Sequence, residues 1–167
     1  GTIKIHDVVF DGSYTTISDK LVSVERKDTE AVKSLVVLDD DRIVTGTEDG
    51  SLTVWRVEEN TIEEVVVKKK AHKDNYYCDI INMLCVLGDG CIVSGNACGI
   101  LKKWRVGESA IEEEAVKHEK SLRCLCALDD VRFVSGNMSS IKVWRVGEST
   151  IEEMAVKQFA HGKEVNC

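Results

Sequence analysis

The chain has 167 residues, enough for one ordinary domain or for a few small repeated units. It carries 22 Lys and Arg residues against 29 Asp and Glu residues, and this formal net charge of −7 argues against a broad phosphate-binding surface, so no nucleic-acid partner is predicted. No stretch approaches the roughly 20 apolar residues that cross a bilayer and the first residues lack the pattern of a signal peptide, so we expect no membrane insertion and a cytoplasmic or nuclear protein that is not secreted.

A repeated segment is the strongest signal in the sequence. Residues 104–117 and 144–157 read WRVGESAIEEEAVK and WRVGESTIEEMAVK, differ at two of fourteen positions and start 40 residues apart. A weaker copy, WRVEENTIEEVVVK, starts at Trp55, 49 residues before Trp104. A fixed period of about 20 to 50 residues indicates a repeat architecture.

The units follow one another along the chain. Residues 1–20 match the end of a unit, because His6 falls in the Trp position. Three full units span residues 32–68, 80–117 and 121–158, and residues 164–167 match the start of another. In each full unit, short apolar or β-branched runs separated by acidic or glycine turns predict three strands, the third ending in Trp. These predicted strands are Leu35–Leu38, Ile43–Thr45 and Leu52–Trp55, then Met83–Leu87, Ile92–Ser94 and Leu101–Trp104, then Cys124–Leu128, Phe133–Ser135 and Ile141–Trp144.

The fourth segment of each unit, such as residues 111–117, contains good helix formers, so a helix is an alternative there. The segment is too short for an isolated helix, and Gly107 or Gly147 before it suits a hairpin turn. We favour an exposed outer strand. Four strands in about 40 residues correspond to one propeller blade.

The blocks TGTEDGSLTVW at 45–55 and SGNMSSIKVW at 135–144, with the Ala-His pairs at 71–72 and 160–161, resemble the WD40 repeat family. The resemblance implies an all-β chain forming a partial WD40-type β-propeller with four-stranded antiparallel blades. It also implies a non-catalytic protein–protein interaction scaffold that needs no cofactor. Because propellers of this family close with about seven blades, we expect a fragment or a shared ring, with the remainder of the propeller coming from a longer chain or another subunit.

The family's buried network joins a His, a Ser or Thr, an Asp and the Trp, and none of these units completes it. Cys98 stands in the Asp position of the second unit, and a deletion near Ser139 removes the Asp from the third. The positions that match, to which we assign a structural role, are Thr45, Asp49, Trp55, His72, Ser94, Trp104, His118, Ser135, Trp144 and His161.

Turn residues differ between the units while the strands repeat, as expected if the strands carry structure and the turns carry specificity. We therefore expect partner proteins to contact the turns at one propeller face. The candidate partner-binding residues are Thr47, Glu48, Lys73, Asp74, Asn96, Ala97, Lys120, Asn137 and Met138.

The seven cysteines form an odd set without secretory context, so we expect free thiols, with Cys124 and Cys126 on one strand face and Cys85 and Cys126 in the core position of Val36. Their spacing does not favour a metal site.

The chain has no phosphate-binding glycine loop, nucleophile elbow or HExxH helix, and its recurring His residues favour a structural role, so no catalytic residue is predicted. Two alternatives to a plain scaffold stay open. One is a substrate-recognition arm of a larger ubiquitin-ligase or enzyme-linked protein, and the other is an architectural subunit of a large assembly.

Overall fold

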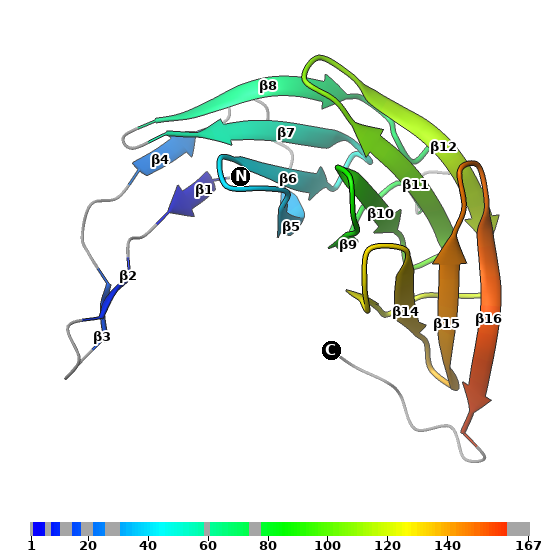
Figure 1. The fold of residues 1–167 in the computed structure, drawn as a ribbon. Coiled ribbons are helices and arrows are strands. Elements are labelled where there is room, and N and C mark those ends of the chain that lie inside the picture. The colour runs from blue at the N-terminus through cyan, green and yellow to red at the C-terminus, as the bar shows by residue number, and fades with distance from the viewer. Residues whose placement is uncertain are drawn as a thin grey trace.

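Strands make up all the regular structure that the computed structural model describes (Figure 1). The described residues are 2–5, 8–10, 15–17 and 22–25, followed by 31–58, 61–73 and 78–159. His6, Asp74, His161 and residues 164–167, which carry expectations above, lie outside these ranges.

Three four-stranded antiparallel sheets, the blades, follow one another in the chain, and within each blade the strands are neighbours in chain order. The first blade contains β5 (Val32–Val37), β6 (Arg42–Thr47), β7 (Leu52–Val57) and β8 (Ile62–Lys68). The second contains β9 (Met83–Val86), β10 (Cys91–Gly95), β11 (Ile100–Val106) and β12 (Ile111–His118). The third contains β13 (Cys124–Ala127), β14 (Arg132–Gly136), β15 (Ser140–Val146) and β16 (Ile151–Gln158).

The blades stand side by side along an arc, with the first strand of each blade toward the concave side and β8, β12 and β16 along the outside (Figure 1). The all-β prediction is confirmed, and the fourth segments are strands rather than helices. In every blade the pairing with the fourth strand shifts register immediately before the Trp, at Trp55, Trp104 and Trp144. Such a bulge bends the strand locally and re-aims side chains.

A hairpin of two paired parts precedes the first blade. Strand β1 (Thr2–Ile5) pairs with β4 (Val22–Glu25), and β2 (Val8–Phe10) pairs with β3 (Thr15–Ile17), so the chain runs out along β1 and β2 and returns along β3 and β4. Strand β4 lies beside β8 (Figure 1).

Two of the three core clusters among the described residues lie between blades, and the third, of Ile43, Trp55 and Ile62, belongs to the first blade. One cluster joins Val44 and Val54 of the first blade to Ile92 and Trp104 of the second. The next joins the second blade to the third, where Phe133 stacks on Trp144 with ring centroids 6.1 Å apart. Because a single sheet has no partner for its apolar face, each blade depends on the next one for burial.

Tight turns at the blade ends depend on glycine. Gly99 has a φ of +96°, and a Cβ at this position would overlap the carbonyl oxygen of Glu119 in the linker to β13. Gly107 lacks a positive φ, and its nearest obstacle is the Ala110 carbonyl oxygen at 3.6 Å.

These two glycines form a matched pair for mutation. We expect Gly99→Ala to lower the free energy of unfolding by at least about 2 kcal/mol, because it adds backbone strain and a steric overlap. Gly107→Ala should change it by less than about 0.5 kcal/mol. Urea denaturation of both variants measures the difference, and equal stabilities would contradict the turn geometry described.

Candidate partner-binding face

The turns β6–β7, β10–β11 and β14–β15 lie at one face of the blades, together with the linkers that enter the next blade. Backbone hydrogen bonds hold each turn to the linker beside it. The Ile81 amide donates to the Thr47 carbonyl (3.1 Å), the Leu122 amide to the Ala97 carbonyl (3.5 Å) and the Phe159 amide to the Ser139 carbonyl (2.8 Å). This face therefore contains the turns whose sequences differ between the repeat units.

Among the expected contact residues, Glu48, Lys73, Ala97, Lys120 and Met138 are exposed. Met138 is the largest apolar one, with 45% of its surface accessible.

Two other expected contact residues, Thr47 and Asn96, are buried, so they cannot present a side chain to a partner and that assignment is wrong. Both hold their turns together instead. Thr47 Oγ1 donates to the Asp49 carboxylate (2.6 Å), and Asn96 Oδ1 accepts from the Ile100 amide (2.9 Å). Half-buried Asn137 does the same in the third blade, accepting from the Ser140 amide (2.8 Å).

A groove of about 310 Å³ lies at the inner end of this face, where β5, β9 and β13 begin. Lys33 and Arg123 are the two cations that line it, and none of the described lining residues is acidic. Both side chains are exposed, and Lys33 pairs with Glu48 across 3.2 Å, whereas Arg123 pairs with no acidic residue among those described. Sequence reasoning missed the groove, because it forms only when the first strands of three blades converge.

Each blade ties its second strand to its third through the buried Trp. The indole Nε1–H groups of Trp55, Trp104 and Trp144 donate to the hydroxyls of Thr45 (2.9 Å), Ser94 (2.8 Å) and Ser135 (2.8 Å), respectively. A buried indole N–H needs such an acceptor. Thr45, Ser94 and Ser135, to which we assign a structural role, thus each accept a hydrogen bond from the Trp of their own blade.

The second blade alone, within the described residues, extends this bond into a network with a His. His72 Nε2 lies 2.6 Å from Ser94 Oγ, and Nδ1 lies 3.3 Å from Asn96 Nδ2. Since Asn96 Oδ1 accepts from Ile100, its Nδ2 must donate, so Nδ1 of His72 accepts and Nε2 carries the proton. Burial, and then the charge of Lys102, lowers the pKa of His72 to about 3, so the ring is neutral.

His118, assigned the same role in the third blade, does not join Ser135. It is the exposed last residue of β12, paired with Ile100. In the first blade, Asp49 caps its own turn by accepting from the Ser51 amide (3.1 Å).

The expectation of free thiols is wrong for Cys78 and Cys98, which form a disulfide with their Cα atoms 5.6 Å apart. The bond joins the linker before β9 to the β10–β11 turn, and the Cys78 carbonyl also accepts from Asn96 Nδ2. Cys98 occupies the place that Asp49 has in the first blade, so a covalent bond stands where that Asp would be.

The thiols of Cys85, Cys91 and Cys126 are free, but their settings differ. Cys85 is buried, which raises the pKa of its thiol to about 12, while Cys126, also expected in the core, is exposed. The reason is that the face of the third blade that carries Cys126 has no further sheet against it among the described residues. Within the described ranges, no cluster of His, Cys, Asp and Glu could hold a metal ion.

Comparisons with known proteins agree with this geometry. No family model and no curated protein matches the sequence. Three solved structures align over 83% of the chain: RRP9 WD40 repeats (20% identity, TM-score 0.65), U3-55K (21%, 0.66) and Saccharomyces cerevisiae Sqt1 (13%, 0.63). The chain spans 42%, 42% and 38% of these structures, respectively. The fold is therefore that of a partial WD40 propeller. No described helix is long and apolar enough to cross a membrane.

Among the described residues, Ser94 serves two buried partners and Ser135 one, which allows a matched comparison. Ser94→Ala leaves both the Trp104 indole and His72 without their hydroxyl partner, so we expect a loss of about 2 to 4 kcal/mol in the free energy of unfolding. Ser135→Ala should cost about 1 to 2 kcal/mol, and exposed Ser109→Ala almost nothing. Denaturant titration orders the three variants, and a Ser135 loss as large as that of Ser94 would refute the extended network.

The neutral His72 makes stability depend on pH. Its folded-state pKa of about 3 lies below the ordinary value of 6.5. The unfolded chain therefore takes up a proton below pH 6.5 while the folded chain does not, and stability present above pH 6.5 is lost as the pH falls. We expect a decrease of about 2 kcal/mol between pH 7 and pH 5, before carboxylates titrate. His72→Gln should flatten this part of the curve, and an unchanged slope in the variant would contradict the assignment.

Proposed function

We propose that these WD40-type blades act as a non-catalytic protein–protein interaction scaffold whose partners bind the turns and the groove at the face described above. The observation that carries the proposal is the segregation of constant and variable parts. The strand sequences and Trp hydrogen bonds recur in every blade, whereas the exposed turn residues Glu48, Ala97 and Met138 differ and share one face. A surface that varies on a constant frame is typical of a recognition surface.

The groove adds a chemical preference to this face. Its lining cations, Lys33 and Arg123, suit an acidic segment of a partner, and Arg123 is the one that forms no ion pair among the described residues. We expect the partners to be proteins of the cytoplasm or nucleus, and the remainder of a propeller, from a longer chain or another subunit, to be among them. The Cys78–Cys98 disulfide is one observation that argues against these two compartments, because disulfide bonds are rare in the reducing cytoplasm and nucleus.

Charge reversal in the groove tests this proposal. We expect Arg123→Glu to reduce the recovery of bound proteins in quantitative affinity purification by about tenfold, because it places a carboxylate opposite an acidic segment. Lys157→Glu, the same charge change on exposed β16, is the matched control and should keep the partners. A second set, Glu48→Ala, Lys120→Ala and Met138→Ala, tests the turns, and all partners remaining bound to both sets would overturn the proposal.

A second candidate, an architectural role through the outer strands, is favoured by apolar side chains exposed there. Val116 on β12 is 41% accessible, and Met154 and Val156 on β16 are 47% and 46% accessible. Partners that persist with Arg123→Glu but are lost with Met154→Glu would support this candidate over the first.

A further inference from the structure

An arginine clamp joins the first blade to the second. Arg42, at the start of β6, donates from Nε to Asp39 (2.8 Å) and reaches Glu108 of the second blade with Nη1 (3.3 Å). Arg56 contacts the other Glu108 oxygen at 3.3 Å. One guanidinium thus bridges two carboxylates from neighbouring blades, and a second guanidinium shares one of them.

The second blade has lost both intrablade partners of this clamp at once. Gly88 and Cys91 stand where the first blade has Asp39 and Arg42. The third blade keeps the pair as Asp129 and Arg132, whose carboxylate oxygen and Nε lie 2.6 Å apart. The joint loss of an acid and its arginine from the middle repeat is therefore a local feature of the second blade.

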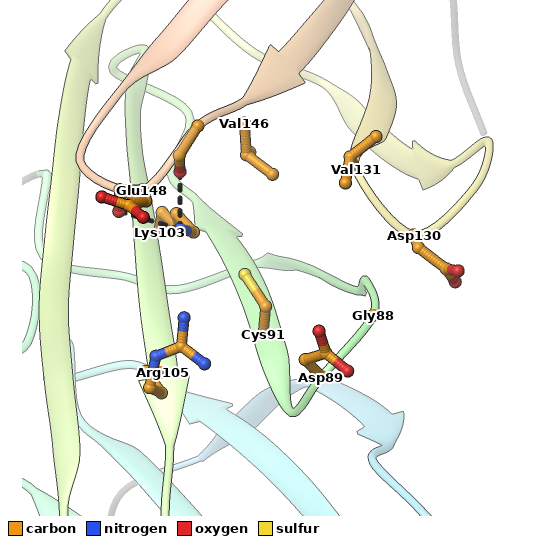
Figure 2. A pocket seen from close by; sticks show the side chains of 10 residues that line it. Gly88, Asp89, Cys91, Lys103, Arg105, Asp130, Val131, Val146 and Glu148 are labelled. Atoms are coloured by element: carbon orange, nitrogen blue, oxygen red, sulfur yellow. Dashed lines mark hydrogen bonds between the residues drawn. The ribbon is translucent and has the colours of Figure 1, made fainter.

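A pocket of about 310 Å³ lies beside Gly88 and Cys91, at the junction between the second and third blades (Figure 2). Cys91 lies between the cations Lys103 and Arg105 on one side and Asp89 and Asp130 on the other, with Glu148 near Lys103 (Figure 2). The β9–β10 turn that contributes Gly88 and Asp89 is at the opposite end of the blades from the partner-binding face. The site is thus independent of the proposed function.

One carboxylate of the clamp remains beside the pocket, and a second comes from a residue outside the Asp39 position. Glu148 has the repeat position of Glu108. Asp130 stands against Gly88, because a Cβ on Gly88 would lie 2.7 Å from Asp130 Cβ and 3.1 Å from its Cγ. Asp130 thus brings a carboxyl group beside the place of the missing Asp39 equivalent. Among the described residues, no cation pairs with the side chains of Asp89, Asp130 or Glu148.

The two cations of the pocket are already engaged elsewhere. Lys103 Nζ donates to the carbonyls of Gly147 (2.7 Å) and Glu148 (3.0 Å) and pairs with Glu114 (2.7 Å). Arg105 Nε pairs with the other Glu114 oxygen at 2.6 Å. The pocket therefore has free carboxylates, while its positive charges are already paired.

We propose that this pocket binds an arginine side chain presented by a partner protein, whose guanidinium takes the place that Arg42 has at the first junction. The planar fork of a guanidinium can bridge carboxylates of two blades, as Arg42 does, whereas an ammonium group is a point charge. A neighbouring arginine is no obstacle, because Arg42 and Arg56 share Glu108. A metal ion is not the favoured occupant, since no described acidic cluster is close enough to hold one.

The test is a titration of the whole chain with the peptide acetyl-Gly-Arg-Gly-amide, followed by amide NMR. Gly88, Gly90 and Gly147 lie at or beside the pocket and report its occupancy. We expect saturable shifts of these three signals with the arginine peptide, weaker shifts with the lysine peptide and none with the citrulline peptide. Citrulline keeps the shape of arginine but removes its charge.

Variants separate the pocket from general attraction by the net negative charge. Asp130→Asn and Glu148→Gln should each weaken binding about tenfold, since each removes a charge-assisted contact. Glu112→Gln, the same charge change on exposed β12, should leave binding unchanged. Cys91→Arg restores the built-in arginine and should abolish binding, and if that variant does not fold, the two carboxylate variants decide. Absent glycine shifts at millimolar peptide, equal shifts with citrulline, or equal weakening by Glu112→Gln would overturn the proposal.

Discussion

Each sheet of this structure buries an apolar face against the next sheet, and the other features of the structure depend on this packing. The row of Cys85, Val93 and Ala115 in the second blade is buried because the third blade packs on it. The corresponding row of the third blade contains Cys126, Val134 and Ala155, and it is half-buried or exposed. Burial in this architecture therefore belongs to the junctions, and what a junction contains decides both stability and the sites available for binding.

The two junctions differ at both ends of the blades. At the partner-binding face, the second blade combines the His72 network with the Cys78–Cys98 disulfide, while the described residues of the other blades have the Trp hydrogen bond and local turn hydrogen bonds but neither a buried His nor a disulfide. At the opposite face, the first junction is closed by Arg42 and the second is open at Cys91. The middle blade is thus the most constrained at one end and the least filled at the other.

Repetition made most of the fold predictable. The recurring Trp, with a Ser or Thr about ten residues before it, predicted the strands and the residues that accept the indole hydrogen bonds. Repetition failed where linker length differs. A turn separates His72 from β8 and lets the ring reach Ser94 of the next blade, whereas His118 directly follows Lys117 and ends as part of β12. Alignment placed the two residues together, but only one has the chain length needed to reach its Ser.

The other differences from the predictions depend on spatial proximity. The disulfide joins cysteines 20 residues apart in sequence, and nothing in their spacing distinguishes them from free thiols. Thr47 and Asn96 are variable turn residues, yet their polar atoms bond inward to complete the turn. The loss of Asp39 and Arg42 equivalents at Gly88 and Cys91 was visible in the repeat, but its meaning depends on Glu108 crossing the junction.

Hydrogen–deuterium exchange followed by NMR tests most directly whether blades are stabilised by their junctions. Strands β10 and β11 have sheets packed on both faces, whereas β14 and β15 have a sheet on one face among the described residues. The amides of β10 and β11 should exchange the slowest in the chain, and those of β14 and β15 measurably faster. Equal protection of the two pairs would contradict the account, because each blade would then be stable without its neighbour.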